Sequence, residues 1–260
     1  MKARKARRTV KNTFFLMSIV IVALIPNRSP GQELTAEAIL ARIDDNMVYE
    51  SAYSEMDMII TIGKRVIKKE LISYAEGIEK SFVEFLSPAR DRGTKMLKTG
   101  KILKIYFPSA ERVMRLSGHM LKQSMMGSDF SYEDMMETAE ELKEQYDVKL
   151  LGEEVFNEVP CYVLELTSRD ESRTYFFRKI WVDKEKFIGH KAEFSAKSGK
   201  LLKVMTVGNI QSFQNRYYPT RVTMEDKLRE NSKTEMVIKN IQFDAPIPEG
   251  TFTERNLMRR

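Results

Sequence analysis

Short runs in which apolar and polar residues alternate recur along most of this 260-residue chain. In the first run Met56, Met58 and Ile60 are every second residue, which is the period of a β-strand with one buried face. Similar runs, separated by glycine, proline and serine, follow at 65–74, 81–86, 95–98, 102–107, 112–116, 148–155, 161–167, 175–182, 191–195, 201–213, 217–226 and 234–243. This succession predicts a meander of roughly a dozen antiparallel strands. It disfavours the alternation of strands and helices that builds a parallel, doubly wound sheet.

An antiparallel sheet of this size twists and curls instead of staying flat. The expected fold class is therefore mainly β, with a strongly curved antiparallel sheet that forms an unclosed half-barrel. Helical segments that precede or interrupt the strands are the natural cover for its concave side. The first of these is predicted after Leu34, with Thr35 as the N-cap and Ile39, Leu40 and Ile43 on one face.

The alternation also stops between residues 117 and 146, which predicts a helical insert between two halves of the sheet. One face of this predicted helix carries apolar and aromatic residues, at Tyr132, Met135, Met136, Leu142 and Tyr146. The opposite face carries glutamates, at positions 133, 137, 140, 141 and 144, and we expect it to be solvated.

The N-terminus has the pattern of a secretory signal peptide, residues 1–31. A basic stretch leads into 13 mostly apolar residues (14–26), and small residues allow cleavage after Gly31. The alternative is a retained anchor, but a membrane-spanning helix needs about 20 apolar residues. No cysteine follows the apolar run as a lipidation site. We expect residues 32–260 to form one soluble, periplasmic domain.

The charge of the chain does not indicate a nucleic-acid partner. The formal net charge of +6 comes from seven basic residues among the first 31, and the remainder has 36 basic and 37 acidic residues. Binding to phosphate backbones depends on many uncompensated cations on one face.

Residue types that carry catalysis or bind metals are scarce. The chain has two histidines and the single Cys161, so no disulfide, cysteine-rich metal site or cofactor is predicted. A Ser/His/Asp set is conceivable from Ser117, His119 and Asp129, or around His190 with Ser195. We assign no catalytic residue and keep a lipid-acting esterase or phospholipase as the alternative function.

Methionine is concentrated beside and within the insert, where its adaptable side chain suits a promiscuous apolar surface. We predict that the lid and wall of an apolar cavity comprise Met56, Met58, Ile60, Phe82, Phe107, Met114, Met120, Met125, Met126, Phe130, Tyr132, Met135, Met136, Leu142, Tyr175, Phe177 and Trp181. Tyr175, Phe177 and Trp181 are taken to share one face of a strand. The same residues can instead fill a closed core, and the sequence does not separate the two interpretations.

Three segments resemble the outer-membrane lipoprotein-sorting protein family, which includes relatives of the periplasmic carrier LolA and of its receptor LolB. They are FVEFLSPARDRGTKMLK (82–98), YFPSAERVMRLSG (106–118) and QSMMGSDFSYEDM (123–135), and the similarity extends over residues 34–257. The resemblance implies an unclosed barrel with helices as a lid over an apolar cavity that shields acyl chains.

The resemblance also implies a function and partners. The expected function is a periplasmic carrier that shuttles lipoproteins or other lipids between the inner and outer membranes. The expected partners are the acyl chains of lipoproteins or phospholipids, an inner-membrane lipid or lipoprotein exporter, and an outer-membrane acceptor. We expect a monomer, and a lipid-sensing regulatory protein remains a further alternative.

Overall fold

The computed structural model describes residues 34–47, 49–137, 139–213 and 216–259, which belong to one compact unit, Leu34–Arg260. The predicted signal peptide and its cleavage at Gly31 lie outside these residues. No helix in the described ranges has the length and apolar character needed to cross a membrane.

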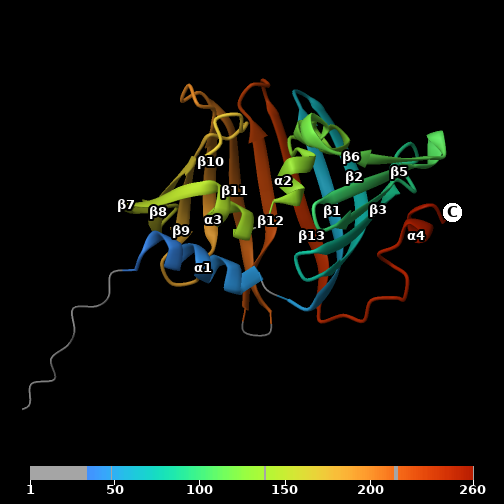
Figure 1. The fold of residues 1–260 in the computed structure, drawn as a ribbon, viewed down its shortest axis with the longest axis horizontal. Coiled ribbons are helices and arrows are strands. Elements are labelled where there is room, and N and C mark those ends of the chain that lie inside the picture. The colour runs from blue at the N-terminus through green and yellow to red at the C-terminus, as the bar shows by residue number, and fades with distance from the viewer. Residues whose placement is uncertain (1–33, 48, 138, 214–215, 260) are drawn as a thin grey trace, which may run out of the picture. The chain divides into compact units, whose positions relative to one another are not determined.

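One antiparallel sheet contains all thirteen strands (Figure 1). Their bounds are β1 Ser51–Ile62, β2 Arg65–Glu76, β3 Lys80–Ser87, β4 Lys95–Thr99, β5 Ile102–Phe107, β6 Arg112–Leu116, β7 Tyr146–Phe156, β8 Val159–Ser168, β9 Phe177–Asp183, β10 Gly189–Ser195, β11 Leu201–Phe213, β12 Arg216–Asp226 and β13 Ser232–Phe243. The spatial order is β6-β5-β4-β3-β2-β1-β13-β12-β11-β10-β9-β8-β7. The sheet is not closed, because β6 and β7 form its two edges, and the predicted fold class is confirmed.

The pairing of β1 with β13 joins the two halves of the sheet, β1–β6 and β7–β13. Every other neighbouring pair consists of strands that are consecutive in the chain, as expected for a meander. Alternation gives the sheet an inner face, on the side of α1 and the insert, and an outer face.

The first helix, α1 (Ala36–Met47), begins where the sequence predicts it, and the Ala38 N–H donates to the Thr35 hydroxyl at 3.2 Å. Its buried Ile39 and Leu40 pack on Tyr146, Leu164 and Val182. Helix α1 therefore covers the inner face of the second half of the sheet.

The insert differs from the single helix predicted over its second part. It consists of 3₁₀ turns at Gly118–Lys122 and Met125–Gly127, then two short helices, α2 (Tyr132–Met136) and α3 (Ala139–Gln145). Ser131 and Asp134 form a reciprocal capping box that starts α2. Glu137 has an extended backbone (φ −66°, ψ 136°), so the helix ends there. This break gives α2 and α3 different faces to cover.

The outer face has its own cover in the first half of the sheet. The last helix, α4 (Glu254–Leu257), packs its fully buried Leu257 on Phe82, Leu97 and Tyr106. The ammonium of Lys104 pairs with Glu254 and fixes this segment to β5.

Candidate functional site

A cavity of about 640 Å³ lies between helix α2 and the inner face of the sheet at the first half and the adjoining strands β12 and β13. Its apolar wall comes from β1–β5 and β12–β13: Ala52, Met56, Met58, Leu71, Ala75, Val83, Phe85, Met96, Leu103, Tyr218, Met236, Ile238 and Ile241. The insert contributes Met125, Tyr132, Met135 and Met136. This volume is within the range of small-molecule binding sites, about 300–1,000 Å³.

Part of the cavity wall consists of small side chains that lie opposite one another in two paired strands. In the register of β1 and β2, Ala52 lies opposite Ala75 and Ser54 lies opposite Ser73, and all four residues line the cavity. One pair further along, Met56 lies opposite Leu71. These small inward side chains leave space that belongs to the cavity.

Buried lysines on the inner face fix the insert above this wall. Lys69, 2% exposed, donates from its ammonium to the Met126 carbonyl at 2.7 Å and pairs with Asp91 at 2.9 Å. Lys98, 9% exposed, donates to the carbonyls of Ile78 and Met136 at 3.0 and 3.2 Å. A charge at these inward positions is costly without such partners.

A buried ion pair fixes the end of α2 to the second half of the sheet. The Arg178 guanidinium donates to both oxygens of Glu137, at 2.6 and 2.5 Å, and packs over the ring of Tyr146. Burial disfavours the charge of Arg178, but Glu137 more than offsets this effect and raises the pKa of Arg178. The expectation that Glu137 is solvated is therefore wrong, because its helix ends and turns this carboxylate inward.

The predicted Ser/His/Asp sets are not assembled. Both carboxylate oxygens of Asp129 accept hydroxyl hydrogen bonds, one from Ser232 and one from Thr234. His190 lies 3.4 Å from Asp183, which also accepts from the backbone N–H groups of Glu185 and Lys186. The carboxylates of Asp129 and Asp183 therefore each accept hydrogen bonds from groups outside the predicted sets. Within the described ranges, no group of three or more His, Cys, Asp or Glu side chains is arranged to hold a metal ion.

The structure brings most of the predicted lid and wall residues together. Those that line the cavity are Met56, Met58, Met125, Tyr132, Met135 and Met136. Those that pack in the same apolar cluster without lining it are Ile60, Phe107, Met114, Met120, Met126, Phe130 and Tyr175. Their contact with lipid stays a prediction.

Four of the predicted lid and wall residues lie elsewhere: Phe177, Trp181, Phe82 and Leu142. Tyr175 precedes β9, which begins at Phe177, so the alternation from Tyr175 does not continue into the strand. The inward residues of β9 include Arg178 and Val182, while Trp181 packs with Cys161 and Val163 in a separate cluster. Phe177 and Trp181 are therefore outward residues, and their placement on the cavity wall is wrong.

Phe82 and Leu142 are displaced for different reasons. Phe82 packs with Leu257 on the outer face of β3, and its neighbours Val83 and Phe85 line the cavity instead. Leu142 follows the break at Glu137 and packs with the cluster under α1. The sequence contains no signal that a helix covers the outer face of β3.

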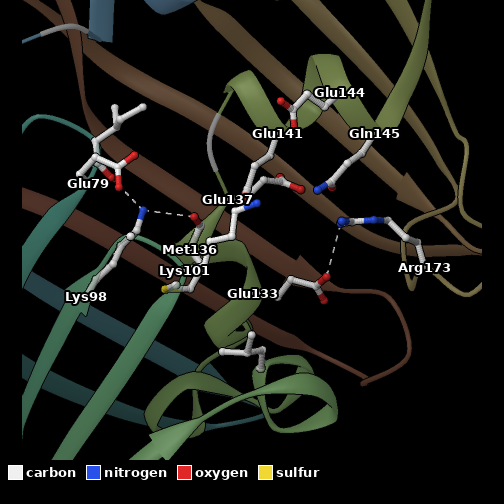
Figure 2. Close-up of a pocket in the computed structure, with 13 residues that line it drawn as sticks. Glu79, Lys98, Lys101, Glu133, Met136, Glu137, Glu141, Glu144, Gln145 and Arg173 are labelled. Carbon is white, nitrogen blue, oxygen red and sulfur yellow. Dashed lines mark hydrogen bonds and ion pairs between the residues drawn. The ribbon is translucent and has the colours of Figure 1, made fainter.

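A second pocket, of about 400 Å³, adjoins the cavity and has a charged lining (Figure 2). Ile78, Lys98, Met136 and Glu137 line both spaces. The remaining charged lining residues are Glu79, Lys101, Glu133, Glu141, Glu144 and Arg173. Sequence reasoning missed this pocket, because it forms only when α3 is brought beside β4.

Comparisons with known proteins agree with this geometry. The sequence profile of a family described as “Uncharacterized protein” matches residues 77–259. A DUF1329 family protein from Desulfovibrio piger has a TM-score of 0.79 at 25% identity, over 86% of this chain and 99% of that one. A LolA superfamily protein from Nitrosomonas europaea has a TM-score of 0.69 at 26% identity, over 85% and 99%.

The chain belongs to the family whose profile it matches, and its fold is LolA-like. A putative outer membrane lipoprotein-sorting protein domain from Vibrio parahaemolyticus shares the fold, with a TM-score of 0.76 at 23% identity over 86% of this chain and all of that one. Among curated proteins, none matches the sequence.

Proposed function

We propose that this LolA-like protein is a non-enzymatic periplasmic carrier that binds the acyl chains of lipoproteins or other lipids and shuttles them between the inner and outer membranes. The observation that carries the proposal is the cavity of about 640 Å³ between the curved sheet and α2. Its lining by methionine and aliphatic side chains suits flexible hydrocarbon.

The energetics of acyl chains explain why such a protein needs this cavity. Each CH₂ group removed from water contributes about 0.8 kcal/mol, so a lipid does not leave a membrane without an apolar shelter. No chemistry at the site is then needed for release. The lipid passes to an acceptor that binds it more tightly, and an inner-membrane exporter supplies it.

The relatives support the proposal at the level of the fold. The Vibrio protein is described as a putative lipoprotein-sorting domain, and its likeness to this chain extends over nearly the whole described unit. Export to the periplasm rests on the signal-like pattern of residues 1–31.

The proposal is tested with Met135, which lines the cavity and is 46% exposed. Met125 is a poorer choice, because it is 4% exposed and its replacement by glutamate is expected to unfold the core. Met135→Glu places a charge in the cavity at little cost to folding. Binding of a fluorescent fatty acid is expected to weaken at least about tenfold, since the acyl chain then lies against a carboxylate.

The matched control is Met258→Glu, which changes a methionine of similar exposure, 52%, outside the cavity lining. This variant is expected to bind the fatty acid as the wild type does. Equal binding by the wild type and Met135→Glu would contradict the proposed cavity site.

A further inference from the structure

The junction between the apolar cavity and the charged pocket centres on Lys98 of β4 (Figure 2). Its ammonium donates to the carbonyls of Ile78 and Met136. Both acceptors are neutral, and a lysine ammonium has three N–H donors, so the described partners leave one donor for another acceptor. Burial lowers the pKa of Lys98, and the nearby carboxylates of Glu141 and Glu79 act in the opposite direction.

The position of Lys98 fits an anionic group at the end of an acyl-containing ligand. The side chain is 9% exposed and lies beside the apolar lining of Met136. A cation in such surroundings is stabilised when an anion provides a charge-assisted hydrogen bond. Because Lys98 lines both spaces, a lipid with its chains in the cavity and its headgroup in the charged pocket has its phosphate near Lys98.

The rest of the charged pocket has an excess of carboxylates. Five glutamates and three cations line it. Two of these glutamates face cations within the pocket: Glu133 lies 3.6 Å from Arg173, and Glu141 lies 3.8 Å from Lys101. Glu144 lies on α3 at the far side of the pocket from Lys98, as Figure 2 shows. Carboxylates in this position favour a cationic group and disfavour an additional anion.

We propose that the charged pocket binds the zwitterionic headgroup of a diacyl phospholipid, with its phosphate at Lys98 and its ammonium toward Glu144 of α3. This inference rests on the proposed carrier function, because the acyl chains occupy the adjoining cavity. A purely anionic headgroup lacks the ammonium, and an uncharged one provides no phosphate to accept from the remaining N–H donor of Lys98.

The test measures the affinity of the mature chain for three lipids with the same fluorescent acyl chain. They carry a phosphoethanolamine, a phosphoglycerol or an uncharged glycerol headgroup. The wild type is expected to bind all three and to prefer phosphoethanolamine by about tenfold over the other two. Soluble glycerophosphoethanolamine is expected not to compete, because without acyl chains it lacks most of the binding energy.

Lys98→Met is expected to lower the affinity for the phosphoethanolamine lipid about tenfold and to change binding of the uncharged lipid less than about twofold. The matched control is Lys95→Met in the same strand. Lys95 is also buried, at 7% exposure, but it donates to the Arg259 carbonyl on the side of the C-terminal segment. Lys98→Arg is expected to restore binding, since it keeps the charge.

Glu144→Gln is the second variant, at an exposed residue. Its result does not depend on whether the fold tolerates a substitution at the buried Lys98. It is expected to reduce the preference for phosphoethanolamine over phosphoglycerol. Equal affinities of the wild type for the three lipids, or equal losses in Lys95→Met and Lys98→Met, would overturn the headgroup assignment alone. Failure of the wild type to bind even the uncharged lipid would overturn the carrier function, and the headgroup site with it.

Discussion

The two halves of the sheet have the same alternating pattern but different interiors. In the first half, small residues at Ala52, Ser54, Ser73 and Ala75 leave the cavity open under α2. In the part of the second half around β7–β10, large side chains fill the same face: Tyr146, Tyr175, Arg178 and Phe194 are each no more than 7% exposed. The period of the sequence determines which residues face inward, and their size determines whether the interior is open or filled.

The helical segments that cover the two halves also differ in how they are held. Helix α1 packs tightly on the second half through Ile39 and Leu40. The insert that covers the first half is fixed by polar contacts, of Lys69 with the Met126 carbonyl before α2 and of Arg178 with Glu137 at the end of α2. Polar anchors hold α2 in place without filling the space beneath it.

The largest expected effect comes from the anchor that joins the insert to the filled half. Glu137→Gln leaves the guanidinium of Arg178 buried without its ionic partner, and removing one member of a buried pair costs about 3–5 kcal/mol. The free energy of unfolding in urea measures this loss. Glu235→Gln is the control, because its partner Arg221 has a 47% exposed side chain and such pairs contribute about 0–1 kcal/mol. Equal losses of unfolding free energy in Glu137→Gln and Glu235→Gln would show that the buried Glu137–Arg178 pair contributes no more than an exposed pair.

Enlarging one alanine in each half tests the comparison itself. Ala192, 3% exposed in the packed core, has no space for leucine, and overpacking costs about 1–3 kcal/mol. Ala75→Leu extends into the cavity and is expected to change stability by less than about 0.5 kcal/mol while reducing uptake of a fluorescent fatty acid. Urea unfolding and fatty-acid titration of both variants provide the check. A large loss of stability in Ala75→Leu would mean that the first half is filled as well.

The architecture is predictable from the sequence because strand period and turn residues are local signals. Met56 and Met58 face inward as predicted, and Thr35 caps α1. The end of α2 at Glu137, by contrast, has no local signal in the sequence. A run of glutamates at helical spacing predicts a solvated face, and only the distant Arg178 shows why the chain turns there.

The buried, inward-facing lysines are the other feature that the sequence does not predict. Lys69 and Lys98 occupy positions that a hydrophobic pattern excludes from a core. Each has a carbonyl partner in the insert, Met126 for Lys69 and Met136 for Lys98, and the insert is remote from both lysines in sequence. The charged pocket beside Lys98 depends on these long-range contacts, and it was not predicted for that reason.

The smallest expected effect is a pH dependence at Lys98. Because burial lowers the folded-state pKa below the ordinary value of about 10.4, the unfolded chain binds more protons between the two values. The destabilising contribution of Lys98 is therefore fully present at neutral pH and is relieved as the pH rises through the folded pKa. The stability of the wild type relative to Lys98→Met is expected to rise in that alkaline window, as measured by urea unfolding at several pH values. A constant difference would contradict the cost of burial assigned to Lys98.

The most direct test of the central claim, that the open half of the sheet holds acyl chains, is native mass spectrometry with lipid extraction. The chain is purified from a Gram-negative periplasm, alongside the Ala75→Leu variant. The account predicts a stoichiometric diacyl lipid or acylated peptide on the wild type and its loss from the variant. An empty wild-type protein that also fails to take up a fluorescent fatty acid would contradict it.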